Sequence, residues 1–148
     1  MFTHILIPTD GSELSAVATE SALSLAKTHK AKVTIMMASP TFRQMADEGF
    51  ILPGLQMGKR DWEEAATNRA RKVLDDVAGQ AASAGVKCDT VHVFKDMPHT
   101  AIIDTAKKQG CDLIVMGSHG YGGFKQWVLG NETTRVLSQS KIPVLVYR

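Results

Sequence analysis

The sequence predicts an α/β protein: a single open five-stranded parallel sheet with helices on both faces. Short apolar runs alternate along the chain with longer segments in which apolar residues recur at helical spacing. Such alternation builds a parallel sheet, because each helix returns the chain to the same end of the sheet. The 148 residues have the usual length of one domain, so we treat 1–148 as a single domain.

The first half of the chain predicts two strands with a helix between them, followed by a long connection. Residues 4–8 form an apolar run without alternation, which is typical of a central parallel strand. A turn at 9–12 follows, and Ser12 is a candidate N-cap of the next helix. Residues 32–38 predict the second strand.

The connection 39–58 contains prolines and glycines that break helices and strands, yet it is also apolar. We therefore expect it to lie against the body of the protein, the functional site or a second subunit, with a helical turn at 42–47. Packing alone and a lid over the site are both open interpretations.

The second half predicts two long helices, three strands and a short final helix. Residues 61–84 carry one apolar stripe, which Gly85 ends. Residues 86–94 predict a strand near an edge, and a helix starts around Pro98 and stops at Gly110. Residues 113–116 predict a strand buried on both faces, and Pro143 leads into an edge strand at 144–146.

A glycine-rich turn separates the fourth predicted strand from the last helix. Glycines let the backbone approach a ligand closely, and the N–H groups and dipole of a helix start favour phosphate. We expect Asn131 to be the N-cap of that helix. The stretch is not a Walker A loop, because no Gly-Lys-Ser/Thr closes it, and it is not a dinucleotide fingerprint, because Lys125 stands where the last glycine belongs.

The spacing Gly117-x2-Gly120-x9-Gly130 is similar to the nucleotide-binding signature of the universal stress proteins, G-2x-G-9x-G-Ser/Thr. Asn131 replaces the hydroxyl residue at the last position. The opening ILIPTDGS of residues 5–12 also resembles the first strand and turn of that family. The resemblance covers nearly the whole chain. It implies a Rossmann-like sheet of the adenine nucleotide alpha hydrolase type, an adenine nucleotide ligand (ATP, ADP or AMP) and a homodimer.

The resemblance also implies roles for individual residues. Asp10 would accept hydrogen bonds from the ribose hydroxyls, whereas composition alone favours a solvated turn residue that caps the helix. Hydroxyls of Ser118 and Thr133 would add donors to the phosphate-binding backbone. The predicted binding residues are Pro8, Thr9, Asp10, Ala38, Met116, Gly117, Ser118, His119, Gly120, Gly122, Gly123, Gly130, Asn131, Glu132 and Thr133. Glu132 counts against ATP, because its charge would lie beside the phosphates, and Asn131 lacks the family's hydroxyl. A Mg²⁺ ion held by the phosphates and Asp10 is conceivable.

Composition narrows the partners. The net charge of +2 is too balanced to favour nucleic acid or an anionic membrane, and no apolar run approaches the ~20 residues of a membrane span. Two isolated cysteines and an opening strand predict a cytoplasmic protein. An apolar edge at Val144, Leu145 and Val146 predicts pairing in a homodimer.

Catalytic motifs are missing from the sequence, so at most slow ATP hydrolysis is expected. The leading hypothesis is a stress-response module that binds adenine nucleotide. The alternatives are an interaction protein of the same fold that binds no nucleotide, and a slow ATP hydrolase.

Overall fold

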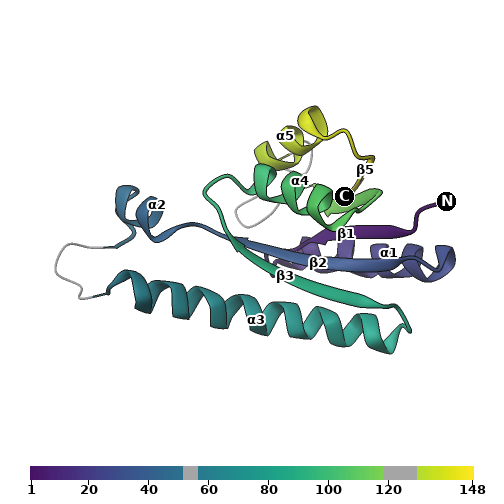
Figure 1. The fold of residues 1–148 in the computed structure, drawn as a ribbon, viewed down its shortest axis with the longest axis horizontal. Coiled ribbons are helices and arrows are strands. Elements are labelled where there is room, and N and C mark those ends of the chain that lie inside the picture. Colours follow the sequence, from purple (N-terminus) through teal and green to yellow (C-terminus); the bar gives the residue numbers. More distant parts are fainter. Residues whose placement is uncertain (52–56, 119–129) are drawn as a thin grey trace.

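A computed structural model describes residues 1–51, 57–118 and 130–148, and in this part of the chain it shows one parallel sheet of five strands (Figure 1). The strands are β1 (His4–Pro8), β2 (Lys32–Ser39), β3 (Cys88–Phe94), β4 (Leu113–Gly117) and β5 (Val144–Tyr147). The helices are α1 (Glu13–His29), α2 (Phe42–Asp47), α3 (Lys59–Ser83), α4 (Pro98–Gln109) and α5 (Asn131–Gln139). The predicted fold class is confirmed.

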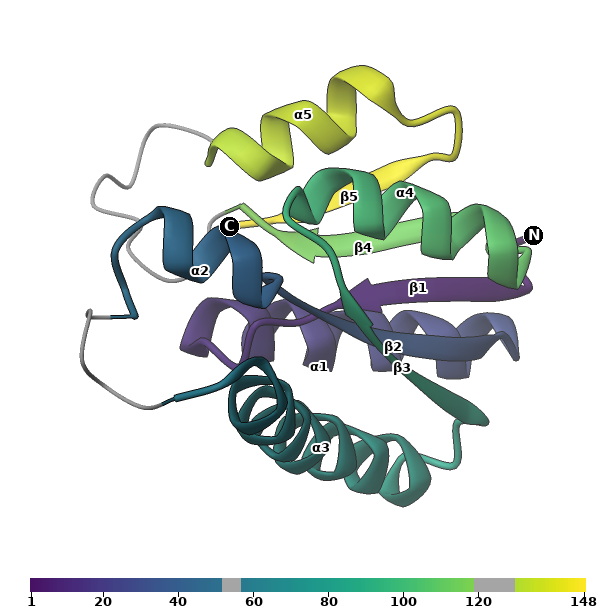
Figure 2. The ribbon, with the colours of Figure 1, turned by 60° about the vertical axis from the view of Figure 1, so that its left-hand side comes forward.

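The helices cover both faces of the sheet. Figure 2 shows α1 and α3 on one side and α4 and α5 on the other. Alternate residues of each strand point to opposite faces, so Ile5 and Ile7 pack with α1 and α3, whereas Leu6 packs with α4 and α5. The sheet is thus buried on both faces, which explains why its inner strands read as continuous apolar runs.

The strand order is β3-β2-β1-β4-β5, so β1 lies at the centre and β3 and β5 lie at the edges. Both edge positions agree with the sequence prediction. Along β5 the side chains alternate between partly buried and exposed, and Leu145 and Tyr147 are the exposed residues. This edge strand therefore presents apolar side chains to solvent.

Local signals explain most of the helix ends. The Ser12 side chain accepts a hydrogen bond from the Ser15 N–H (3.2 Å), which confirms the predicted N-cap of α1. Gly85 and Gly110, which follow α3 and α4, adopt the left-handed conformation that glycine tolerates best. The helix predicted at 61–84 lies two residues earlier at its start, and the strand predicted at 86–94 begins at Cys88.

At the amino end of the sheet, Asp112 connects the start of β4 to the start of β1 through hydrogen bonds. Its carboxylate accepts hydrogen bonds from the Thr3 N–H (2.8 Å), the Thr3 hydroxyl (2.7 Å) and the His4 N–H (2.9 Å). Burial opposes ionisation, but the hydrogen bonds from His4 and Thr3 outweigh it and hold the pKa of Asp112 below its usual value.

A carboxylate whose pKa is lowered by folding stabilises the protein above its unfolded-state pKa, and this contribution is lost as the pH falls through the folded-state pKa. We expect Asp112→Ala to lower the free energy of unfolding by about 1–2 kcal/mol at pH 7, because three hydrogen bonds to the charged group are lost. The difference from wild type should shrink below about pH 4, where the unfolded-state carboxyl protonates. Urea unfolding across pH 2–7 measures both values, and a difference independent of pH would contradict the ionic role.

Among the helices within the described ranges, none combines the length and apolar character needed to cross a membrane.

Candidate functional site

The strand order places the candidate site at the carboxyl ends of β1 and β4. The chain turns to one side of β1 to form β2 and β3, and to the other side to form β4 and β5. In open α/β sheets, ligands bind outside the carboxyl ends of the strands at the point where the order reverses. The first turn after β1 and the glycine-rich turn after β4 both begin at this point.

The register of the sheet brings the predicted residues to one level. Pro8 lies opposite Met36 on β2, so the register, continued by two residues, places Asp10 level with Ala38. The register between β1 and β4 pairs Leu6 with Ile114, and four further residues along each strand lead to Asp10 and Ser118, just past the ends of the two strands. Residues from three separate parts of the sequence therefore meet at this edge of the sheet.

The turn after β1 is held by its own hydrogen bonds. The Asp10 carboxylate accepts from the Ser12 N–H (2.9 Å), as in the alternative interpretation of Asp10 as a turn residue. The buried Thr9 hydroxyl accepts from the Gly11 N–H (3.2 Å) and lies 3.1 Å from the Ser15 hydroxyl. Gly11 adopts a positive φ of 78°, and a Cβ there would lie 3.2 Å from a methyl of Val73. The turn is therefore rigid, and its carboxylate has a fixed place.

The glycine-rich segment is closed at its two ends. The Gly130 N–H donates to the Ser118 carbonyl oxygen (2.9 Å), and the Ser118 N–H donates to the Tyr147 carbonyl oxygen (2.8 Å). The end of β4 and the start of α5 therefore lie side by side. The predicted binding residues His119, Gly120, Gly122 and Gly123 lie outside the described residues.

The prediction that Asn131 is the N-cap of the last helix is wrong by one residue. Gly130 is the N-cap, with an extended backbone (φ −59°, ψ 148°), and its carbonyl accepts the first helical hydrogen bond from the Thr134 N–H. Asn131 is the first helical residue and is exposed. Because glycine has no side chain to cap α5, the first-turn N–H groups have no side-chain acceptor on the N-cap residue.

In this structure the Thr133 hydroxyl, a predicted phosphate donor, donates to the backbone. Its single hydrogen is shared between the carbonyl oxygens of Gly117 (3.2 Å) and Ser118 (3.1 Å), and the residue is only 3% exposed. The side chain therefore ties the start of α5 to the end of β4. Only the backbone N–H of Thr133 remains a predicted phosphate donor.

Glu132 points to a partner that sequence reasoning missed. One carboxylate oxygen accepts from the His99 N–H (2.7 Å) and lies 2.8 Å from His99 Nδ1, and the other accepts from Arg135 (3.1 Å). His99 is buried in the first turn of α4. Nothing in the sequence joins two residues 33 positions apart, so this contact appears only when α4 and α5 pack together.

The connection after β2 agrees with the prediction of a helical turn at 42–47, which is α2. Figure 1 shows α2 and the beginning of α3 beyond the carboxyl end of β2. Thr41 anchors α2 by donating from its N–H (3.0 Å) and its hydroxyl (2.6 Å) to Asp96. These hydrogen bonds lower the pKa of Asp96. The Trp62 indole N–H donates to the Pro40 carbonyl (3.4 Å), so part of this connection contacts the body of the protein as expected.

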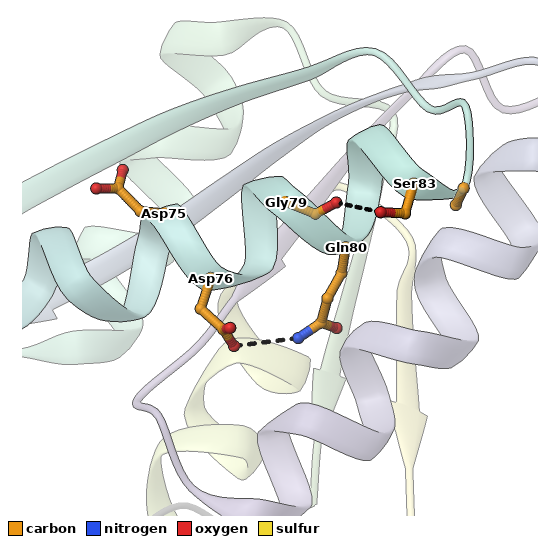
Figure 3. Close-up of a pocket in the computed structure, with 6 residues that line it drawn as sticks. Asp75, Asp76, Gly79, Gln80 and Ser83 are labelled. Carbon is orange, nitrogen blue, oxygen red and sulfur yellow. Dashed lines mark hydrogen bonds between the residues drawn. The ribbon is translucent and has the colours of Figure 1, made fainter.

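A shallow surface pocket on α3 is separate from this site (Figure 3). Its polar groups bond within the helix: Gln80 donates to Asp76 (3.2 Å), and the Ser83 hydroxyl donates to the Gly79 carbonyl (3.0 Å). It lies in the half of α3 that leads into β3, at the opposite end of the sheet. It contains none of the predicted binding residues. Within residues 1–51, 57–118 and 130–148, no group of three or more His, Cys, Asp or Glu side chains gathers to hold a metal.

The fold and the site define a class of protein: an open α/β sheet whose central switch point carries a carboxylate turn after β1 and, after β4, Ser118 next to the start of α5. The chain belongs to the universal stress protein family, because the model of the family described as "Universal stress protein family" matches residues 1–148. The universal stress protein YxiE of Bacillus subtilis is 31% identical over 152 residues, with all of both chains covered. The family resemblance seen in the sequence is therefore confirmed.

Solved structures agree with this fold. The structure of MJ0577, a universal stress protein of Methanocaldococcus jannaschii, superposes with a TM-score of 0.83 at 27% identity, covering 99% of this chain and 95% of that one. A universal stress protein in complex with cAMP (TM-score 0.68, 22% identity, 99% and 97% covered) shares the fold. So does one from Archaeoglobus fulgidus in complex with dAMP (TM-score 0.71, 16% identity, 99% and 98% covered).

Proposed function

We propose that this universal stress protein binds an adenine nucleotide at the carboxyl ends of β1, β2 and β4. One observation carries the proposal: Asp10 after β1, Ala38 of β2 and Ser118 after β4 lie at the carboxyl ends of three neighbouring strands, and Ser118 is hydrogen-bonded to Gly130 at the start of α5. Two proteins of the same fold, solved in complex with cAMP and with dAMP, support an adenine ring and a phosphate as the recognised groups.

The proposed roles follow from position. Asp10 accepts hydrogen bonds from the ribose hydroxyls, because its carboxylate is held at the end of the central strand. Pro8, Thr9 and Ala38 border the base through backbone and small side-chain atoms. The phosphates lie against the amides of the segment after Met116 and of the first turn of α5, where the helix dipole favours negative charge. If Mg²⁺ accompanies the nucleotide, the phosphates and Asp10 would hold it, and the ion would neutralise part of the phosphate charge.

Isothermal titration calorimetry tests the proposal. The purified protein is titrated with ATP, ADP, AMP, cAMP and GTP, each with and without Mg²⁺. Binding of adenine nucleotides in preference to GTP is the expected result. Mass spectrometry of the supernatant after denaturation would also detect an adenine nucleotide retained through purification. No binding of any nucleotide at millimolar concentration would overturn the proposal and favour a nucleotide-independent interaction protein.

We also propose a homodimer formed through β5. This strand lies at the edge of the sheet, and its Leu145 is 44% exposed, which is a liability unless another chain covers it. Leu145→Glu should shift the protein from dimer to monomer in sedimentation velocity, because the substitution buries a charge in an apolar interface. Leu137→Glu is the matched control, since Leu137 is similarly exposed on α5. A wild-type protein that sediments as a monomer at high micromolar concentration would exclude this dimer.

We place this function in the cytoplasm. Cys88 and Cys111 are free thiols, and burial raises the pKa of Cys111 to about 11, so this thiol stays protonated and unreactive. Fractionation of cells that express the full chain tests the location, and recovery outside the cytoplasm would contradict it.

A further inference from the structure

We propose that His99 is a positioning residue for the nucleotide site. By holding the Glu132 carboxylate against the start of α4, His99 keeps a negative charge away from the phosphate-binding amides of α5. This inference rests on the nucleotide binding proposed above and adds a residue outside the family signature.

The contact is built from two hydrogen bonds to one oxygen. Glu132 Oε2 accepts from the His99 backbone N–H at 2.7 Å and from Nδ1 at 2.8 Å. Because an ionised carboxylate only accepts hydrogen bonds, Nδ1 carries the hydrogen. Arg135 holds the other oxygen at 3.1 Å. The His99 side chain is only 7% exposed, so its ring has one fixed place between α4 and α5.

The contact matters for binding because Glu132 lies at the start of α5. Glu132 is the second residue of α5, next to the amides proposed to bind phosphate. A carboxylate turned toward the bound phosphates would repel them, and the repulsion would grow with the charge of the ligand. The His99 N–H, in the first turn of α4, instead donates to the carboxylate at the favourable end of that helix's dipole. The structure thus turns an unfavourable residue into one that is compatible with phosphate.

The same contact helps to fix the start of α5. The helix is also held by the Thr133 hydroxyl at the end of β4 and by the fully buried Val136. The contact between His99 and Glu132 therefore adds α4 to the elements that hold the start of α5.

The test compares ligands that differ only in phosphate number. Calorimetry gives the dissociation constants of ATP, ADP, AMP and adenosine for wild type, His99→Ala, His99→Asn, Glu132→Gln and the His99→Ala/Glu132→Gln double variant. We expect His99→Ala to weaken ATP about 5–10-fold and adenosine less than about 2-fold, because one hydrogen bond to the carboxylate is lost. His99→Asn should retain ATP affinity, since its side-chain amide can donate in place of Nδ1.

Glu132→Gln separates charge from structure. Its amide oxygen still accepts from His99, so alone it should change ATP affinity less than about 3-fold, because the carboxylate already points away from the phosphates. In the double variant, removing the released charge should restore ATP binding to within about 2-fold of wild type. Equal losses for adenosine and ATP in His99→Ala, or no recovery in the double variant, would overturn the inference. So would a gain above about 10-fold from Glu132→Gln alone.

Two controls keep the inference distinct from the proposed function. His29→Ala, in the last turn of α1, is the matched histidine substitution and should leave all four constants unchanged. Hydrogen exchange of the ligand-free protein should be faster at residues 131–133 in His99→Ala than in wild type or His99→Asn. Unchanged exchange would contradict the claim that His99 fixes the start of α5. If wild type binds none of the ligands, the proposed function fails, and the exchange rates alone decide whether His99 holds α5.

Discussion

Replacing Leu6 with alanine should lower the free energy of unfolding by about 3–4 kcal/mol, the largest stability effect that we expect from a single substitution. Leu6 is fully buried in the central strand and packs against Met36, Ile114 and Val136 on the face covered by α4 and α5. Truncation to alanine removes apolar contacts and leaves a cavity, because neighbours on a central strand are held by hydrogen bonds on both sides and relax little.

Urea unfolding followed by far-UV circular dichroism measures this effect. Leu137→Ala is the matched control, because the same side chain is 42% exposed on α5, and its removal should cost less than about 1 kcal/mol. The midpoint of Leu6→Ala should fall while the slope of the transition stays unchanged. Similar losses for the two variants would contradict the placement of β1 at the centre of the core.

The strands could be predicted from the sequence because burial on both faces leaves a direct signal. Residues such as Ile5, Leu6 and Ile7 are apolar without interruption, and the structure buries all three completely. The edge strand β3 carries a weaker signal: Cys88 packs against the cluster on one face of the sheet, Val91 and Val93 pack against the cluster on the other, and no residue of the strand is fully buried. A buried strand is apolar along its own sequence, so it can be predicted without knowing which segments pack against it.

The details of the site depended on contacts between distant segments. The Thr133 hydroxyl looked available until its acceptors at the end of β4, 15 and 16 residues away, were in place. Glu132 looked like a charge beside the phosphates, and its partner His99 lies 33 residues earlier in the chain. The Asn131 error has a local cause, because Asn and Gly both suit an N-cap and neighbouring positions compete for it.

The central part of the site was predictable because it follows from topology. A carboxylate turn after the first strand and a glycine turn after the fourth are far apart in sequence. They meet only if the first and fourth strands are neighbours, and the order β3-β2-β1-β4-β5 makes them so. The family resemblance gave Asp10 a ligand-binding role, whereas composition alone left it as a turn residue, and the strand order came only with the structure.

Asp10→Ala should raise the dissociation constant for ATP about 30-fold, the largest effect on binding that we expect from a side chain in the described part of the site. In the proposed complex the carboxylate accepts hydrogen bonds from the ribose, and charged hydrogen bonds are worth about 1.5–3 kcal/mol, which corresponds to this change. Adenosine and ATP should lose similar factors, because the ribose is common to both. Calorimetry with the two ligands measures this, and loss of ATP alone would place Asp10 at the phosphates or their Mg²⁺.

Two further variants separate the ligand role from the turn. Asp10→Asn keeps an oxygen that accepts from the Ser12 N–H, as the carboxylate does at 2.9 Å, so the turn should persist while the charge is lost. We expect it to weaken binding by less than Asp10→Ala but measurably, since a neutral acceptor forms the weaker hydrogen bond. Asp75→Ala, exposed on α3 at the other end of the sheet, is the matched control and should bind as wild type. Unchanged ATP binding in Asp10→Ala would show that Asp10 only stabilises the turn. Other groups at the switch point would then have to bind the ribose.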